Sequence, residues 1–482
     1  MIKYYRQFAS TAVGLCASVF ASFASAAPEI KAMPVQAYES KVLLNIHGSN
    51  TVGARLVPTW AEDYLSALGM QNINKKELGV ANEFAIEGEL DGQNYAIHIA
   101  AHGSSTGFKS LIADTANIAM ASRQIKDKEV AALAKSGDMR SYEAEKVVAI
   151  DGLAIIVHPS NQIDKLSIDQ VAALFSGQVS NWAQLGGANV AVTRYARDSN
   201  SGTWDTFKSL VLRKKYQLET STRRFESNDE LSDLVALDRG AIGFVGLASV
   251  RDSKAIAISD SGSAALSPEH LQVATEDYPL SRRLYLYLPP SPVNPRANDF
   301  IEFALGQASQ KRVDEIGFVS LNPLVNQGDS LQQGPKAYQQ LANIADRLSI
   351  NFRFDAGSAK LDNRAKRDIQ RLVDFMKQDT NKDLRIQLVG FGDLKQSPER
   401  AILLSKLRAS AVQSALHKNG ISTLPVAGFG SVKPVASQEA QGRTKNQRVE
   451  VWLVNKSKLD AIAKLKQEAS YTARGDSRIA YF

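Results

Sequence analysis

Three short stretches rich in glycine and hydroxyl side chains each follow an apolar run and precede a helical pattern. They are residues 48–52, 103–107 and 197–203. Hydroxyl groups and the unpaired first backbone N–H groups of a helix can donate hydrogen bonds, and the positive end of the helix dipole lies at the same place. The guanidinium of Arg197 adds a forked donor. The combination predicts a binding site for a tetrahedral anion.

A single turn of this kind has an ordinary structural explanation, because glycine and serine cap helices and permit tight turns in any α/β protein. Three such turns, with Arg123 and Arg197 each at the end of a short apolar strand, favour a binding site instead. The alternative role for each arginine is a surface ion pair, for example with Asp127 or Asp205.

The apolar pattern places these turns between strands and helices. A long apolar run at residues 147–158 predicts a buried strand that crosses between two lobes. Residues 70–92 are polar and rich in turn formers, which predicts an insertion containing a hairpin. Shorter strands are expected at residues 41–46, 95–101, 118–121 and 241–247. Strands that alternate with helices favour an α/β fold with mostly parallel sheets.

A second domain is expected near the end of the chain, after a Pro- and Gly-containing linker at residues 323–345. Its pattern alternates strand and helix over roughly a hundred residues, which suits a small α+β domain. The expected elements are strands at 350–354, 384–388 and 449–453 and helices at 362–378 and 398–418. A charged tail, residues 456–482, follows.

The first 26 residues predict a cleavable signal peptide. Lys3 and Arg6 precede an apolar run, and Ala24-Ser25-Ala26 forms a small-residue cleavage site. The single cysteine, Cys16, lies inside this segment, so the exported chain is expected to lack disulfides. Export predicts a periplasmic location.

Length and charge limit the remaining possibilities. A chain of 482 residues predicts two or three domains. The formal net charge is +7, but the basic residues are interleaved with acids and form no aromatic-lined stripe, which argues against nucleic-acid binding. The six histidines form no H-E-x-x-H motif, and neither a G-x-S-x-G nor a Walker pattern occurs. We therefore expect no enzyme, no catalytic residues, no metal and no cofactor.

The motif set as a whole resembles a known family. Taken in order, five segments are similar to the phosphate-binding proteins of ABC transporters (PstS type): residues 48–52 (GSNTV), 103–107 (GSSTG), 121–123 (ASR), 197–203 (RDSNSGT) and 243–247 (GFVGL). The resemblance covers residues 41–322. It implies an α/β two-lobe periplasmic-binding-protein (type II) fold that closes on one dehydrated oxyanion. Lobe 1 would comprise about 41–147 and 251–322, and lobe 2 about 148–250.

The resemblance also implies the ligand contacts. These are Thr51, Val52, Ser104, Ser122, Arg123, Arg197, Ser201, Gly202 and Thr203. Some family members carry an aspartate directly after the serine that matches Ser122, where it accepts the proton of hydrogen phosphate. Arg123 stands at that position here, and Asp198 or Asp205 are the alternative acceptors. Phosphate, sulfate and similar oxyanions stay open as ligands.

A second resemblance covers residues 346–455. The segments 352–359, 404–409, 428–430 and 442–450 are similar to the OmpA-like peptidoglycan-binding domain. It implies that Asp393 and Arg408 bind the amine and carboxylate of diaminopimelate, which suits a carboxylate and a forked guanidinium. The pair alone would fit a structural salt bridge equally well. Gly392, Gln396 and Ala401 differ from the common threonine, glycine and asparagine of that family.

Together, these features predict a periplasmic protein that binds inorganic phosphate or a similar oxyanion and is tethered to peptidoglycan near the outer membrane. The implied role is phosphate uptake with an ABC permease as partner. The alternative is a wall-anchored scaffold or sensor whose lobes no longer serve a transporter, since a tethered protein cannot diffuse freely to a permease.

Overall fold

The computed structural model describes residues 40–199, 201–326, 335–354, 358–393, 397–438 and 440–459. The expected signal peptide (residues 1–26) and nearly all of the expected tail (456–482) lie outside these ranges. The chain from Ser40 onward groups into one compact unit. All structural statements below concern this unit.

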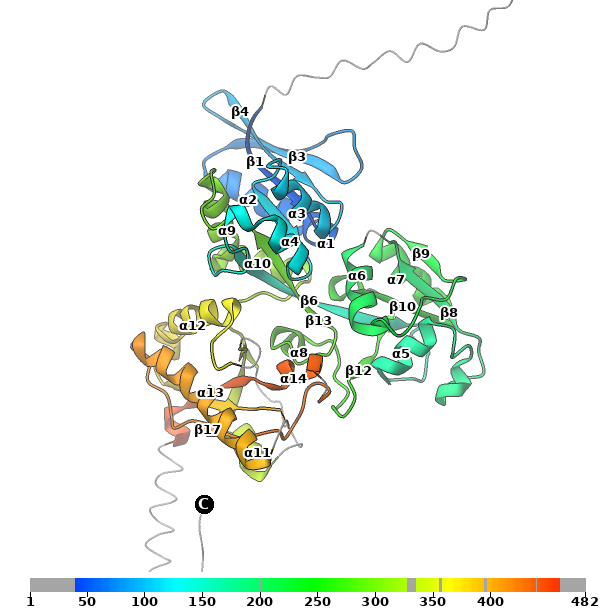
Figure 1. Ribbon diagram of the computed structural model, residues 1–482, viewed down its shortest axis with the longest axis vertical. Helices are drawn as coiled ribbons and strands as arrows, with labels where there is room; N and C mark the ends of the chain where they lie inside the picture. Colours follow the sequence, from blue (N-terminus) through cyan, green and yellow to red (C-terminus); the bar gives the residue numbers. More distant parts are fainter. Residues whose placement is uncertain are drawn as a thin grey trace, which may run out of the picture. The chain divides into compact units, whose positions relative to one another are not determined.

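One large mixed sheet runs through the first three hundred residues (Figure 1). In spatial order its strands are β2 (Gln71–Glu77), β3 (Glu83–Leu90), β4 (Gln93–Ala100), β1 (Lys41–Gly48), β5 (Ile118–Ala121), β13 (Ser281–Tyr287), β6 (Glu145–Val157), β10 (Ala241–Gly246), β8 (Thr193–Arg197) and β9 (Arg223–Phe225). A short strand, β11 (Lys254–Ala255), also pairs with β6.

Strand β6 joins the two lobes. All thirteen of its residues are buried. Its first part, residues 145–152, pairs with β13, and its second part, residues 153–157, pairs with β10. Figure 1 shows β6 and β13 passing between the β1–β5 lobe and the β8–β10 lobe. The long buried strand expected from the sequence is therefore confirmed, and so is the two-lobe fold.

The expectation of mostly parallel sheets is wrong. Parallel pairing joins β1 to β4 and β5, and β8 to β9 and β10. Pairing is antiparallel where β13 meets β5 and β6, where β6 meets β10 and β11, and between β2, β3 and β4. The physical reason is that the lobe-crossing strands run in opposite directions and that the polar insertion returns on itself as a hairpin.

Helices and a second, small sheet complete this part of the chain. The helices are α1 (Asn50–Gly53), α2 (Leu56–Ala67), α3 (Ser104–Ile112), α4 (Asp127–Ala132), α5 (Ile168–Phe175), α6 (Gly202–Phe207), α7 (Asn228–Leu237), α8 (His270–Ala274), α9 (Arg296–Leu305) and α10 (Gln307–Ile316). Strands β7 (Lys165–Ser167) and β12 (Ala257–Ser259) form a two-stranded sheet. Helix α6 continues as one π-helical turn, Lys208–Leu212. No described helix has the length and apolar character needed to span a membrane.

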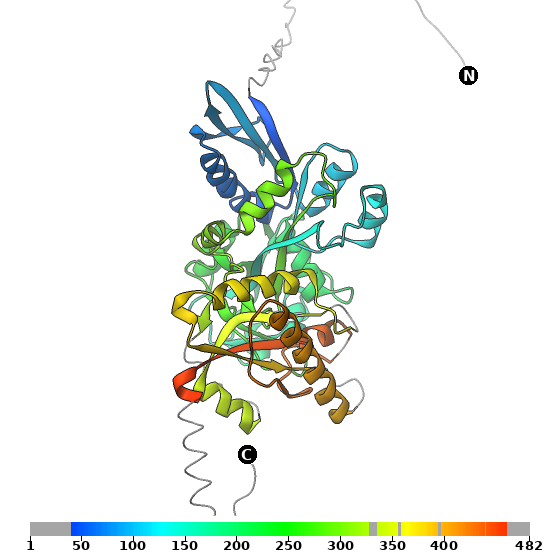
Figure 2. The same cartoon turned by 90° about the vertical axis from the view of Figure 1, so that its left-hand side faces the viewer.

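The C-terminal part forms a separate sheet in the order β14 (Val325–Asn326), β15 (Ala345–Phe352), β18 (Val449–Asn455), β16 (Leu384–Gly390) and β17 (Ala427–Gly428). Its helices are α11 (Lys336–Ile344), α12 (Asn363–Met376), α13 (Pro398–Lys418) and α14 (Ala440–Asn446). Figure 2 shows α12 and α13 beside this sheet. Within the expected linker 323–345 the structure places β14 and α11, and the domain boundaries stay a prediction.

Side chains alternate between the two faces of this C-terminal sheet. Ile350, Leu388 and Val451 lie on one face with residues of α12 and α13. Trp452 and Tyr338 of α11 pack together on the other face. The sheet is thus covered on both sides, as a small α+β domain requires.

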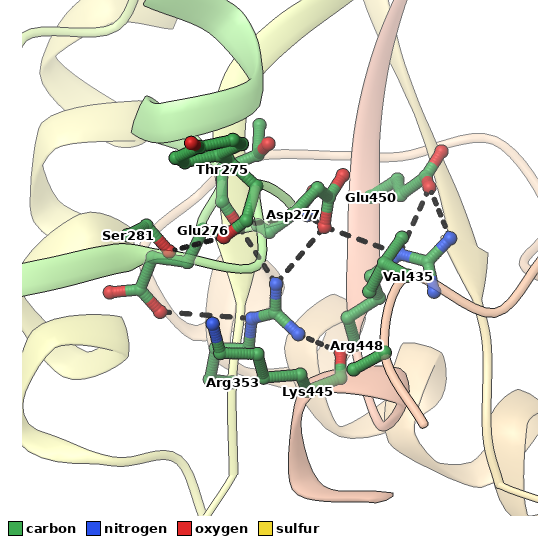
Figure 3. A network of polar contacts seen from close by, with 12 residues as sticks. Thr275, Glu276, Asp277, Ser281, Arg353, Val435, Lys445, Arg448 and Glu450 are labelled. Carbon is green, nitrogen blue, oxygen red and sulfur yellow. Dashed lines mark hydrogen bonds and ion pairs between the residues drawn. The ribbon is translucent and has the colours of Figure 1, made fainter. Parts of the chain in front are cut away.

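A buried ionic network links this sheet to the loop between α8 and β13 (Figure 3). Asp277 lies 2.7 Å from Arg347, 3.0 Å from Arg353 and 3.7 Å from Arg448. Glu276 next to it pairs with Arg283 and Arg364. Figure 3 shows the Asp277 carboxylate facing Arg353 and Arg448, with Glu450 beyond them. Both carboxylates are buried, so the negative charge of each needs to be stabilised by these arginines.

This network predicts a loss of stability in acid. Burial alone would raise the pKa of Asp277 and of Glu276, but the surrounding arginines outweigh it and hold both pKa values well below their ordinary range. Their stabilisation is therefore complete above the unfolded pKa of about 4 and is lost as the pH falls toward the folded values. Urea denaturation between pH 3 and 6 should show the unfolding free energy falling with the pH.

The variant Asp277→Asn should flatten this pH dependence and lower stability at pH 7 by about 3–5 kcal/mol, the usual cost of breaking a buried pair. Asp91→Asn, at an exposed turn, serves as the control and should change neither quantity. A wild-type slope in Asp277→Asn would contradict the assignment.

Candidate functional site

The first two glycine–serine turns and the end of β5 meet at the carboxyl ends of the parallel strands β4, β1 and β5. The amide of Gly103 donates to the carbonyl of Gly48 (2.6 Å), and the amide of Ser49 donates to the carbonyl of Met120 (2.9 Å). Gly48 has φ +137°, and a Cβ there would lie 2.2 Å from the Met120 carbonyl oxygen. Only glycine fits so close to the Met120 backbone. The turns therefore lie at the edge of the sheet where α/β proteins bind ligands.

The third turn approaches from the other lobe. A Cβ placed on Gly202 would lie 2.4 Å from the Ser122 hydroxyl oxygen and 3.2 Å from that of Thr51. Ser201 caps α6, because its Oγ accepts hydrogen bonds from the amides of Thr203 (3.1 Å) and Trp204 (3.3 Å). Three segments that are distant in the sequence therefore meet at one place.

A cavity of about 80 Å³ lies at this meeting point. Its polar lining includes Asn50, Thr51, Asp151, Arg197, Ser201, Thr203 and Arg282. A wider space of about 460 Å³ opens next to it, lined by Asn50, Asn82, His102, Arg197, Asp198, Ser201 and Glu226. The size of the inner cavity suits a small ligand, since pockets for drug-sized molecules measure roughly 300–1,000 Å³.

Arg197 is the predicted cation that reaches this cavity. Its side chain is only 5% exposed. Its Nε donates to the Phe225 carbonyl (3.2 Å) and its Nη2 to the Glu226 carbonyl (2.6 Å). Burial lowers the pKa of Arg197 to about 10, while the nearby Asp198 opposes that shift. The guanidinium is therefore a fixed cation at neutral pH.

Ser104 and Ser122, two of the predicted ligand contacts, lie against one another at the end of β5. The Ser104 Oγ accepts a hydrogen bond from the Ser122 amide (3.1 Å), and the two hydroxyls lie 3.4 Å apart. Both residues are buried, and Ser122 directly faces Gly202. The Val52 side chain is fully buried in the core beneath β1, so only its backbone could contact a ligand.

Arg123 does not line the described cavity. Its guanidinium makes a forked pair with Glu129 (2.7 and 2.9 Å) and donates to the Ser105 hydroxyl (2.9 Å). Burial raises the pKa of Glu129, but Arg123 and the Lys126 amide lower it further than burial raises it. The ion-pair alternative considered for this arginine therefore fits the structure, with Glu129 as the partner in place of Asp127 or Asp205.

Two residues that the motifs did not indicate complete the site. Arg282 on β13 lies directly opposite Asp151 on β6, and its Nε and Nη2 donate to Asp151 Oδ2 (2.8 and 2.6 Å). Arg282 also donates to the Gly202 carbonyl (2.7 Å) and to the Thr203 hydroxyl (3.1 Å). One feature of the sequence could have indicated this pair: Asp151 is a carboxylate inside the apolar run 147–158. A buried charge requires a partner.

In the C-terminal domain, Asp393 and Arg408 line one cavity of about 310 Å³. Both are mostly buried, and within the described part of the chain no ion pair shorter than 4 Å joins them. Gln447 donates to Asp393 Oδ1 (2.8 Å), whereas Asp393 Oδ2 and the Nε and Nη1 of Arg408 have no hydrogen-bond partner. Burial lowers the pKa of Arg408, and Asp393 opposes this shift.

Two α/β lobes joined by crossing strands, with a small polar cavity between them, define the periplasmic-binding-protein class. Residues 76–308 match the model of the PBP superfamily domain, and residues 353–448 match the OmpA family. Over 333 residues the chain is 31% identical to the phosphate-binding protein PstS of Pseudomonas aeruginosa, covering 65% of this chain and 92% of that protein. The chain belongs to the PstS family of phosphate-binding proteins and carries a C-terminal OmpA-family domain.

Two further similarities were found. The chain is 32% identical over 255 residues to the protein SphX of Synechococcus elongatus, covering 50% of this chain and 73% of that protein. The crystal structure of an ABC-type phosphate transport receptor from Vibrio cholerae aligns with a TM-score of 0.45 and 24% identity, covering 57% of this chain and 99% of that one.

The geometry predicts that the two motif arginines contribute unequally to oxyanion binding. Arg197→Gln should weaken the binding of inorganic phosphate at least a hundredfold, because it removes a buried cation from the cavity wall. Arg123→Gln should change it less than about threefold, because that guanidinium is occupied by Glu129. Isothermal titration calorimetry of both variants checks this, and equal losses would contradict it.

Proposed function

We propose that this protein binds inorganic phosphate between its two lobes in the periplasm and is held at peptidoglycan by its C-terminal domain. The observation that carries the first half of the proposal is a small cavity lined by Thr51 and Arg197, at the place where Gly202 of one lobe lies against Thr51 and Ser122 of the other. The relationship to phosphate-binding proteins supports it and does not favour the alternative of a wall-anchored scaffold or sensor whose lobes no longer serve a transporter.

The chemistry of the cavity suits a doubly charged tetrahedral oxyanion. Arg197 and Arg282 supply two positive charges, and Asp151 compensates one of them. Hydroxyl groups of Thr51, Ser201 and Thr203 supply neutral donors at the wall of the same small cavity. Binding of this kind needs no bond to be made or broken, so we infer a binding protein and not an enzyme.

Delivery to an ABC-type permease is the further step that we propose for the bound anion. The chain without residues 1–26 should bind one phosphate per molecule in calorimetry, and cells from which it is deleted should take up less phosphate. No detectable binding of phosphate or sulfate would refute the binding function. Binding with unchanged uptake would refute delivery alone.

We propose that Asp393 and Arg408 bind the amine and carboxylate of diaminopimelate in the cell wall. Asp393 Oδ2 and the Nε and Nη1 of Arg408 support this, because they are buried without a hydrogen bond, which buried polar groups normally have. The one cation near Asp393 Oδ2 among the described ion pairs, Arg443, lies 3.7 Å away. A ligand with one amine and one carboxylate would satisfy both groups, and Gln447 already orients the aspartate.

Arg408→Ala should therefore abolish sedimentation of the protein with isolated sacculi. Lys418→Ala, at the exposed end of the same helix, is the matched control and should sediment like the wild type. Phosphate binding should be unchanged in both variants, since the two cavities share no lining residue. Wild-type sedimentation of Arg408→Ala would refute the assignment.

A further inference from the structure

Helix α12 of the C-terminal domain contacts the first lobe. Arg367 donates two hydrogen bonds, of 2.7 and 3.2 Å, to Glu302 on α9, and its guanidinium carbon lies 5.0 Å from the centre of the Tyr142 ring. The Asn363 amide group donates to the Arg140 carbonyl (2.9 Å). Because α9 packs on β1 in the core of this lobe, these contacts attach α12 to the lobe that contains β1 and β5.

The loop before α14, in the same domain, contacts the second lobe. The Ser437 amide donates to Asp260 Oδ2 (2.8 Å), and Asp260 Oδ1 accepts a hydrogen bond from Arg213 (3.3 Å). Asp260 directly follows β12, which pairs with β7, and β7 leads into α5. Phe175 of α5 packs edge-on against Phe244 of β10, so Asp260 belongs to the lobe that contains β8 and β10.

Between these two contacts, the domain is attached to the segment that leads into the lobe-crossing strand β13. Arg347 and Arg353 each pair with the buried Asp277, and Figure 3 shows the contact of Arg353. Lys445 Nζ donates to the Pro279 carbonyl (2.8 Å). The C-terminal domain therefore contacts the first lobe, the crossing segment and the second lobe at the same time.

The two lobes also contact one another across the cleft in this structure. Arg55 of the first lobe lies 3.8 Å from Asp229 of the second, and Asn82 donates to Glu226 (3.4 Å). Two lobes joined by crossing strands open their cleft by rotating relative to one another about those strands. A body that is attached to both lobes opposes this rotation, because one of its two attachments has to break before the lobes can separate.

We propose that the C-terminal domain is a brace that holds the two lobes closed, so that the bound anion exchanges only when one end of the brace is released. The first-lobe end is formed by Asn363 and Arg367, and the second-lobe end by Ser437 with Asp260. This inference rests on the proposed function, because it concerns exchange of that anion. These four residues line neither the inner cavity nor the outer space. The brace therefore stabilises the closed lobes equally with and without the anion.

The brace has a kinetic consequence that a defect in the anion site would not have. Stabilising the closed lobes equally in both states slows association and dissociation by the same factor and leaves Kd unchanged. The double variant Asn363→Ala/Arg367→Ala releases the first-lobe end and should raise both rate constants at least about threefold, with Kd within about twofold of wild type. Asp260→Ala releases the second-lobe end and should have the same effect. Stopped-flow tryptophan fluorescence with inorganic phosphate measures both rate constants.

Combining the substitutions distinguishes one brace from two independent effects. A brace released at one end no longer acts, so adding Asp260→Ala to the double variant should change the rate constants by less than about twofold. Lys377→Ala, at the exposed C-cap of α12, is the matched control and should exchange phosphate like the wild type. Wild-type rates after release of either end would overturn the proposal. So would faster dissociation with proportionally weaker binding, which indicates damage to the anion site.

A distance measurement tests the brace without any ligand. The only cysteine, Cys16, lies in the expected signal peptide, so the chain without residues 1–26 takes spin labels only at introduced cysteines. Labels at Lys214→Cys in the second lobe and Lys418→Cys in the C-terminal domain should give one narrow distance distribution, which Asp260→Ala broadens. A broad distribution in a chain that binds phosphate would overturn the brace alone. A narrow one in a chain that binds no phosphate would overturn the proposed function and, with it, the role in exchange.

Discussion

The buried ion pair between Arg282 and Asp151 is the interaction on which the rest of the site depends. The two residues lie opposite one another on the antiparallel strands β13 and β6, which cross between the lobes. Through the Gly202 carbonyl and the Thr203 hydroxyl, Arg282 also fixes the first turn of α6. Because removing one member of a buried pair leaves an uncompensated charge, neither residue can be replaced independently. The pair thus determines where the second lobe presents its hydroxyl groups.

Much of the fold could be predicted from local pattern. The apolar pattern marks strands such as β5 and β6 and the helix α12, and Pro398 begins α13 as expected. Strand direction could not be read in the same way, because it depends on which distant segments pair. The mixed sheet differs from the mostly parallel sheet that the strand–helix alternation suggested.

In the candidate site, too, local features could be predicted from the sequence and pairings between distant residues could not. The hydroxyl-rich turns were recognisable because capping chemistry is local, and Ser201 does cap α6. The pairing of Arg282 with Asp151 joins residues 131 positions apart, and no spacing rule connects them. For Arg123 the difficulty is different, because its partner Glu129 is close in the sequence, six residues away on α4. An arginine after a strand has the same sequence pattern whether its side chain faces a ligand or a carboxylate.

The segment from the loop after α8 into the start of β13 contacts both the C-terminal domain and the candidate site. Within seven residues it contains Asp277, which pairs with Arg347 of the C-terminal sheet, and Arg282, which pairs with Asp151 at the cavity between the lobes. Charges buried on both sides of so short a segment leave it little rotational freedom. Buried ion pairs to such a segment hold the C-terminal domain more firmly against the lobes than the linking residues alone would. Attachment to the wall would therefore fix the direction in which the cleft opens.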